Sequence, residues 1–327
     1  MVSASVGSFF DAVSQFFSNL AAVSWGTLIL GLALFGIYLA LRSRAWFNVL
    51  RAAYPGEPFE WRRVWGAYMA AYGFNNVVPA RGGDVMKLFL ARSSIPQSSY
   101  PALTSSMLVE AIFDLCIAIP VLAFAFSQGA FPKPPDFSDL GAFDLSFFAS
   151  HPRATLFILT ALGVASLVGF AVLSARVRAF WTRVKQGVVI LRDRRRYLRE
   201  VFAVQLAGWV FRFAAFWCFL EAFGVGGSVQ NVLLVLGCTA VAAIVPFTPG
   251  GAGVQQALLV KVFAGSAAGA TVAAYSVGQQ IAVAAFSLGV GFVALVTIFR
   301  FRSFKDAIRA GREARAAEVR PVAPRSG

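Results

Sequence analysis

Long apolar runs, separated by short polar segments, dominate the pattern of this chain. A helix needs about 20 consecutive apolar residues to cross a bilayer. Five runs meet that requirement, at residues 24–41, 107–127, 154–174, 201–222 and 272–299. An open strand edge would leave backbone groups without partners in lipid, so we expect every span to be a helix. The pattern therefore predicts an all-α, polytopic helical membrane protein.

Two further apolar stretches, 64–91 and 231–262, are broken near the middle by Pro and Gly. The first break is Val-Val-Pro-Ala-Arg-Gly-Gly at 77–83, and the second is Ile-Val-Pro-Phe-Thr-Pro-Gly-Gly at 244–251. Both follow the order apolar helix, Pro, Gly-Gly and second helix. The flanking charges require each stretch to return to its starting side, so each is either a re-entrant hairpin or a pair of spans.

The broken stretches occupy matching places in two halves of the chain. Each lies between two full spans, and the span at 154–174 connects the halves and gives the second half the opposite orientation. The sequence thus predicts two broken re-entrant helical segments in an inverted repeat. In transporters, such interrupted segments form the substrate site. The alternative is a chance similarity between two Pro-Gly loops.

Basic residues indicate the orientation of these spans. The segments 42–63, 81–92, 176–200 and the chain from Arg300 onward hold 25 of the 29 Lys and Arg residues. Cytoplasmic loops are enriched in these residues, so the N-terminus is predicted outside and the C-terminus in the cytoplasm. We expect the basic segments to lie on anionic lipid of the inner leaflet. No recognition module accompanies the charge, so we expect no nucleic-acid partner.

By composition the chain divides into three parts. Residues 1–23 contain no Lys or Arg, which favours an N-terminal interfacial segment over a secretory signal. Residues 24–300 form the predicted transmembrane domain, and residues 301–327 form a basic cytoplasmic tail. The sequence does not indicate an oligomeric state.

The overall composition supports a protein surrounded by lipid. Charged residues make up 13% of the chain and hydrophobic residues 58%, with a mean hydropathy of +0.70, whereas soluble domains carry roughly 25% charged residues. The one histidine, His151, lies in a loop, and Cys116, Cys218 and Cys238 lie inside apolar runs. We therefore expect no cofactor, no metal site and no histidine-based catalytic site.

The residues around the first break have the chemistry of an anion site. A helix that starts at Gly82-Gly83 would present free backbone N–H groups, which attract phosphate. Arg81 lies at the turn and Lys87 about one helical turn later. The candidate substrate-binding residues here are Asn75, Asn76, Arg81, Gly82, Gly83, Asp84 and Lys87. Alternatively, Arg81 and Lys87 only mark the cytoplasmic edge of the membrane.

The second break carries no charge. Thr248 offers a hydroxyl and Gln256 an amide, and Gly250 and Gly251 allow close backbone approach. These four residues are candidates for the other end of a substrate pathway. The alternative is that the glycines only permit tight helix packing.

Besides Glu221 near the end of span 201–222, three charged residues lie inside predicted spans, where charge is costly and is paired or functional. Glu110 and Asp114 are four residues apart and so share one face of span 107–127. Arg212 lies in the middle of span 201–222. We expect Arg212 to face the interior and to meet Glu110, Asp114 or a substrate phosphate. A hydrolase site that uses the two carboxylates is a weaker alternative.

Three motifs, in this order, resemble the lysylphosphatidylglycerol synthase transmembrane region, also called the flippase-like family. They are Asn-Asn-Val-Val-Pro-Ala-Arg-Gly-Gly-Asp-Val-Met-Lys at 75–87, Val-Glu-Ala-Ile-Phe-Asp at 109–114, and Pro-Phe-Thr-Pro-Gly-Gly-Ala-Gly at 246–253. The resemblance covers roughly residues 20–300. It implies an inner-membrane protein connected with moving or modifying lipids. In full synthases a large cytoplasmic domain transfers lysine; here a short basic tail follows Arg300, so we expect no aminoacyl transfer.

Four positions depart from the family pattern. Asp84 stands where Glu is usual, Lys87 where Arg is usual, Ala111 where Arg is usual, and Gln256 where Glu is usual. The changes at Ala111 and Gln256 remove charge, so the coupling to an ion or substrate need not be identical.

The sequence therefore predicts a translocase, or flippase, for an anionic phospholipid or a lipid-linked intermediate. Its partners would be membrane lipids with an anionic headgroup or phosphate. One alternative is a membrane enzyme that acts on a lipid or polyprenyl phosphate with Glu110 and Asp114. A second is a non-transporting scaffold subunit whose basic tail recruits a partner.

Overall fold

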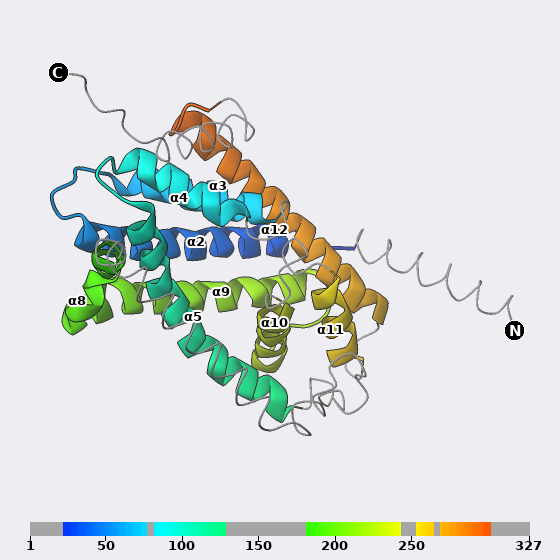
Figure 1. The fold of residues 1–327 in the computed structure, drawn as a ribbon. Coiled ribbons are helices and arrows are strands. Elements are labelled where there is room, and N and C mark those ends of the chain that lie inside the picture. The colour runs from blue at the N-terminus through cyan, green and yellow to red at the C-terminus, as the bar shows by residue number, and fades with distance from the viewer. Residues whose placement is uncertain (1–21, 77–81, 129–180, 243–252, 265–268, 302–327) are drawn as a thin grey trace, which may run out of the picture.

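The computed structural model describes residues 22–76, 82–128, 181–242, 253–264 and 269–301. All regular secondary structure within these ranges is helical (Figure 1). The helices are α2 (Trp25–Ala53), α3 (Trp61–Asn75), α4 (Gly82–Ser94), α5 (Tyr100–Ser127), α8 (Arg194–Tyr197), α9 (Ala203–Ala222), α10 (Val229–Ala242), α11 (Val254–Val262) and α12 (Gly269–Thr297). A 3-10 turn, Val189–Arg192, precedes α8, and one π-helical turn, Leu198–Phe202, joins α8 to α9.

Four helical segments in the described residues are long and apolar enough to cross a membrane. They are Trp25–Ala53, Tyr100–Ala125, Arg194–Ala222 and Gly269–Ile298. They correspond to four of the five predicted spans, and the fifth, 154–174, lies outside the described residues. The sequence therefore predicted these four crossing helices correctly, and the all-helical class is confirmed.

Both broken stretches are interrupted helices, as predicted. In the first, α3 has 15 residues and α4 has 13, and the two helices pack against each other. In the second, α10 has 14 residues and α11 has 9, and these also pack together. A helix of 15 residues is about 22 Å long at 1.5 Å per residue, which is shorter than the roughly 30 Å hydrocarbon core.

Helix contacts made in one half of the chain have counterparts in the other half. At the centre, α2 runs along α9, and the two lie side by side in Figure 1. Around them, α3 packs on α12 of the other half, and α10 packs on α5 of the other half. Within each half, α4 contacts α5 and α11 contacts α12. Each of these contacts therefore has a counterpart in the other half.

The Arg-rich segments gather at one end of the helical assembly. The Asn48 amide donates to the Glu200 carbonyl oxygen over 2.7 Å, and the Gln186 amide donates to the Ala53 carbonyl oxygen over 3.0 Å. These two bonds join the region after α2 to the region before α9. At the opposite end, the Ser24 N–H donates to the Ala222 carbonyl oxygen over 2.9 Å. The segment 42–63 and the described residues 181–200 thus share one end.

The contact between α3 and α4 depends on a glycine. A Cβ at Gly83 would lie 2.1 Å from the Ala71 carbonyl oxygen and 2.6 Å from Asn75 Oδ1. No side chain fits in that space, so glycine is required by the close approach of the two backbones. The prediction that this break needs glycine for close approach is confirmed at Gly83.

We expect Gly83→Ala to lower the free energy of unfolding by about 1–3 kcal/mol, because α4 must move away from the Ala71 carbonyl group. Thermal unfolding of the detergent-solubilised protein measures this. Gly26→Ala is the matched control, since Gly26 is also the second residue of its helix and a Cβ there meets nothing within 4 Å. The control should be unchanged or slightly more stable. Equal unfolding temperatures for the two variants would contradict the packing argument.

Candidate functional site

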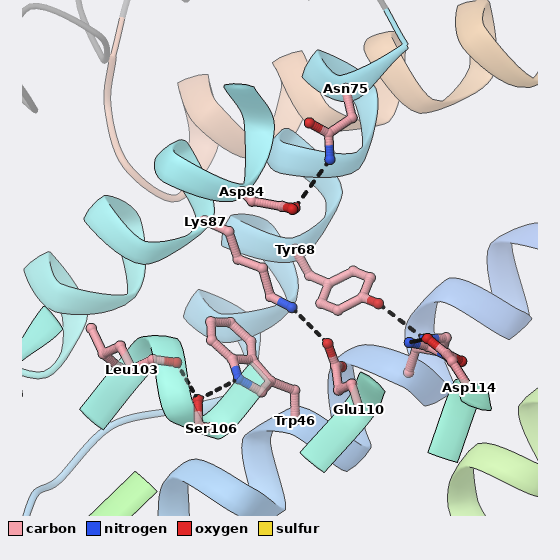
Figure 2. Close-up of polar contacts among 10 residues, drawn as sticks. Trp46, Tyr68, Asn75, Asp84, Lys87, Leu103, Ser106, Glu110 and Asp114 are labelled. Carbon is pink, nitrogen blue, oxygen red and sulfur yellow. Dashed lines mark hydrogen bonds and ion pairs between the residues drawn. The ribbon is translucent and has the colours of Figure 1, made fainter. Parts of the chain in front are cut away.

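Asn75 of α3 bonds to the start of α4. The Gly83 N–H donates to Asn75 Oδ1 over 2.7 Å. The Asn75 amide group donates to Asp84 Oδ1 over 3.1 Å (Figure 2). Asn76 donates to the Tyr72 carbonyl oxygen over 3.0 Å. Both asparagines therefore pair backbone groups beside the break. The amide oxygen of Asn75 occupies the position at which an anion would meet the Gly83 N–H.

Lys87, one turn further along α4, lies inside the protein. Its Nζ donates to Glu110 Oε2 over 2.9 Å, and the two side chains are only 5% and 8% exposed. The ammonium also lies 4.1 Å from the centroid of the Trp46 ring and 4.2 Å from that of Tyr68. Cation–π contacts of this kind gain strength when the cation is desolvated. Figure 2 shows Lys87 and Glu110 meeting from α4 and α5.

Trp46 is held in place beside this ion pair. Its indole N–H donates to the Ser106 hydroxyl over 2.9 Å, and that hydroxyl donates to the Leu103 carbonyl oxygen over 2.6 Å. Trp46 is fully buried. A buried tryptophan normally needs such a partner for its N–H group, so α5 fixes both the carboxylate and the ring that contact Lys87.

A second ion pair lies one turn further along α5. Arg42 of α2 makes a bidentate contact with Asp114, with Nη2 at 2.8 Å from Oδ2, and its Nε donates to the Tyr68 hydroxyl over 3.1 Å. The guanidinium is buried, whereas the Asp114 side chain is 44% exposed. Bidentate guanidinium–carboxylate pairs are geometrically specific and strong. Tyr68 contacts both Lys87 and Arg42, and so joins the two ion pairs into one polar cluster.

These contacts bear on two expectations. Lys87 is enclosed and paired with Glu110, so its expected contact with a phosphate stays a prediction. The expected pairing of Arg212 with Glu110 or Asp114 is wrong, because these carboxylates pair with Lys87 and Arg42, whereas its expected contact with a substrate phosphate stays a prediction. The two observed pairs form because α4 and α2 both pack on α5.

Arg212 is enclosed by aromatic rings. Its guanidinium carbon lies 4.7 Å from the centroid of Trp209, 5.5 Å from that of Tyr38 and 5.6 Å from that of Phe216. Arg212 therefore faces the interior against α2, as predicted. Within the described residues it forms no ion pair.

At the second break, the glutamines of α11 bond to the protein. Gln256 Oε1 accepts from the Gly253 N–H over 2.6 Å, and its amide group donates to Gln280 of α12 over 2.5 Å. The Gln255 amide donates to Thr239 of α10 over 3.2 Å. Gly253 adopts a φ of 86°, a conformation that favours glycine. These bonds join α11 to both of its neighbours.

Four candidate residues, Arg81, Thr248, Gly250 and Gly251, lie outside the described residues. Sequence reasoning missed Arg42, Trp46 and Tyr68. Arg42 follows the predicted span 24–41 and was counted among loop residues. The detectable signal was the continued helical spacing of apolar residues beyond it, at Trp46, Val49, Leu50 and Ala53, all of which are buried.

Within the described ranges, no group of three or more His, Cys, Asp or Glu side chains is placed to hold a metal ion. The polar cluster consists of paired charges and hydrogen bonds, and its carboxylates are engaged by cations.

The chain matches the family model described as "Lysylphosphatidylglycerol synthase TM region" over residues 1–291. This match covers most of the chain and agrees with the resemblance found in the three motifs. No curated protein matches the chain.

We expect the double variant Lys87→Met/Glu110→Gln to lose less free energy of unfolding than the sum of the losses of the two single variants. Removal of Lys87 leaves Glu110 buried without a counter-charge, which costs about 3–5 kcal/mol. Unfolding temperatures of the two single variants and the double variant form the measurement. Simple additivity of the two losses would contradict a buried, coupled pair.

The control for this cycle is the half-exposed pair between Arg196 and Glu200, which are four residues apart at the start of the α9 segment. Its atoms are also 2.9 Å apart, but its side chains are 40% and 29% exposed. A pair of this kind contributes about 0.3–0.5 kcal/mol. Arg196→Gln should therefore change the unfolding temperature very little.

Proposed function

Because the chain belongs to the family of the lysylphosphatidylglycerol synthase transmembrane region, we propose that it is a flippase for an anionic phospholipid or lipid-linked intermediate. The family match and the apolar helices make it a membrane protein. The observation that carries the proposal is the buried Lys87–Glu110 pair directly behind a helix break. A buried, ionised pair inside a membrane domain is costly and marks a substrate or ion pathway in many membrane proteins.

In the proposed cycle, a lipid phosphate takes the place of Glu110 on Lys87. Arg81, at the turn before α4, would meet the phosphate first, because it lies next to the start of the helix in sequence. Lys87 would then exchange one oxyanion for another, and uptake of a proton would neutralise the displaced Glu110 carboxylate. Trp46 and Tyr68 would keep the ammonium in place during the exchange.

The two broken stretches supply the moving parts of this proposal. We infer that α3–α4 and α10–α11 are re-entrant and form an inverted repeat. The short helices and the paired packing of the two halves support this inference. Transporters built in this way rock one half against the other around a site near the bilayer centre.

The proposed orientation places the Arg-rich end in the cytoplasm. The gathering of segments 42–63 and 176–200 at one end supports this orientation, because basic loops remain on the cytoplasmic side. Anionic lipids of the inner leaflet would be the partners of these segments. The enzyme alternative finds less support, since both Glu110 and Asp114 are engaged by cations.

We expect purified protein to accelerate the flipping of a fluorescent phosphatidylglycerol in proteoliposomes, measured by dithionite quenching. Glu110→Gln and Arg81→Ala should each lower the rate about tenfold or more, because each removes a charge from the proposed path. Arg199→Gln is the control, since Arg199 is 84% exposed. A wild-type rate equal to that of empty vesicles, across several anionic lipids, would disprove the flippase proposal.

Orientation is measured separately by cysteine labelling in a variant that lacks Cys116, Cys218 and Cys238. Gly56→Cys lies in the turn after α2, and Gln230→Cys lies at the start of α10, at the opposite end. A membrane-impermeant maleimide should label Gln230→Cys in intact spheroplasts and Gly56→Cys only after permeabilisation. The reverse pattern would show that the basic end faces outward.

A further inference from the structure

One face of α9 carries polar atoms that have no partner. Gln205, Trp209 and Arg212 lie at positions i, i+4 and i+7, so they form one stripe along about 10 Å of the helix. Gln205 is completely buried, and neither its Nε2 nor its Oε1 has a hydrogen-bond partner among the described residues. The same is true of Trp209 Nε1 and Arg212 Nε. We call these three residues the α9 polar face.

The α9 polar face turns toward α2. Gly208, within the same stripe, lies against Tyr38 and Leu41 of α2, and Arg212 stacks on the Tyr38 ring. Phe216, one turn after Arg212, continues the stripe and lies near Phe35 of α2. The polar face therefore lies in the central contact between the two halves. It is not part of either helix break.

Unpartnered polar groups in such a place require a physical reason. Buried amides and indole N–H groups almost always find a partner in the protein, water or a ligand. Helix pairs in membranes are held by small residues and satisfied polar groups. Four buried polar atoms without hydrogen-bond partners lie along this stripe in the centre of the fold. They are therefore consistent with a site at which a bound ligand supplies the missing hydrogen bonds.

The charged side chains in the interior indicate whether that ligand is an anion or a cation. Arg42 is neutralised by Asp114, and Lys87 is neutralised by Glu110. Among the described residues, the Arg212 guanidinium forms no ion pair and lies against the aromatic rings of Tyr38, Trp209 and Phe216. Aromatic rings contact the plane of a guanidinium and leave its N–H edge for an acceptor. An anion would supply the missing counter-charge.

We infer that the α9 polar face binds a phosphate group. Arg212 and the Trp209 N–H would donate to phosphate oxygens, and the Gln205 amide would donate to a third oxygen. Gln205 Oε1 would accept from a hydroxyl or ammonium of the same ligand. This inference rests on the proposed function in one respect, because a lipid headgroup that moves through the protein is the expected source of the phosphate.

Binding is tested by native mass spectrometry of the delipidated, detergent-solubilised protein. The probes are dioleoylphosphatidylglycerol and dioleoylglycerol, which share the same chains but differ in the phosphate headgroup. Wild-type protein should retain the phospholipid and not the diacylglycerol. Arg212→Gln, Gln205→Leu and Trp209→Phe should each weaken retention about tenfold or more, as expected for the loss of a hydrogen bond to a charged group.

Two controls separate a binding role from a structural role. Lys261→Gln and Gln230→Leu change an exposed cation and an exposed glutamine outside the basic segments and should leave retention unchanged. In the lipid-free protein, Gln205→Leu should unfold at the same temperature as wild type or higher, since it removes two buried polar atoms without partners. A purely structural glutamine would instead lose stability on this substitution.

Inorganic phosphate, added as a competitor, distinguishes the source of the phosphate. Competition would show that the face accepts phosphate in general, and its absence would show that the lipid-attached group is required; both support the inference. Unchanged phospholipid retention in Arg212→Gln and Gln205→Leu would overturn it, as would equal retention of diacylglycerol. Normal binding without flipping in proteoliposomes would leave this site intact and remove only the flippase proposal.

Discussion

The structure depends on the neutralisation of charges that lie between packed helices. Lys87 and Glu110 are almost completely buried, and separation of either from its partner would leave a bare charge in a medium of low dielectric constant. This constraint joins α4 to α5, while Arg42 and Asp114 join α2 to α5. These two ion pairs therefore hold α2, α4 and α5 in one arrangement. Lys87 lies one helical turn after the start of α4, where it meets Glu110.

The same constraint limits how the broken stretch can move. If α4 shifts relative to α5, Lys87 must either carry Glu110 with it or find another anion. A substrate with a phosphate group satisfies the second condition, and a neutral molecule does not. In the proposed cycle, movement of α4 would thereby be linked to the charge of what occupies the site. Aromatic contacts from Trp46 and Tyr68 would lower the cost of the proposed exchange without providing a competing negative charge.

Much of the fold could be predicted from sequence because hydrophobic length and Pro-Gly interruptions are local signals. They predicted four of the observed apolar helices, both interrupted stretches and the glycine at position 83. The charge partners could not be predicted in this way. Arg42 appeared to begin a loop, and Arg212 appeared to be the partner of the carboxylates. Which cation meets which carboxylate depends on how α2 and α4 pack on α5, and no spacing along the chain carries that information.

The two helix breaks also share a feature that changes where an anion is expected to bind. At the first, Asn75 Oδ1 accepts the Gly83 N–H; at the second, Gln256 Oε1 accepts the Gly253 N–H. In both places an uncharged amide oxygen occupies the position that an anion would take at a helix N-terminus. These two N–H groups are thus bonded within the protein, whereas Arg212 Nε and the buried amide of Gln205 have no partner among the described residues. We therefore expect an anion to bind between α2 and α9, in the contact that the two halves share.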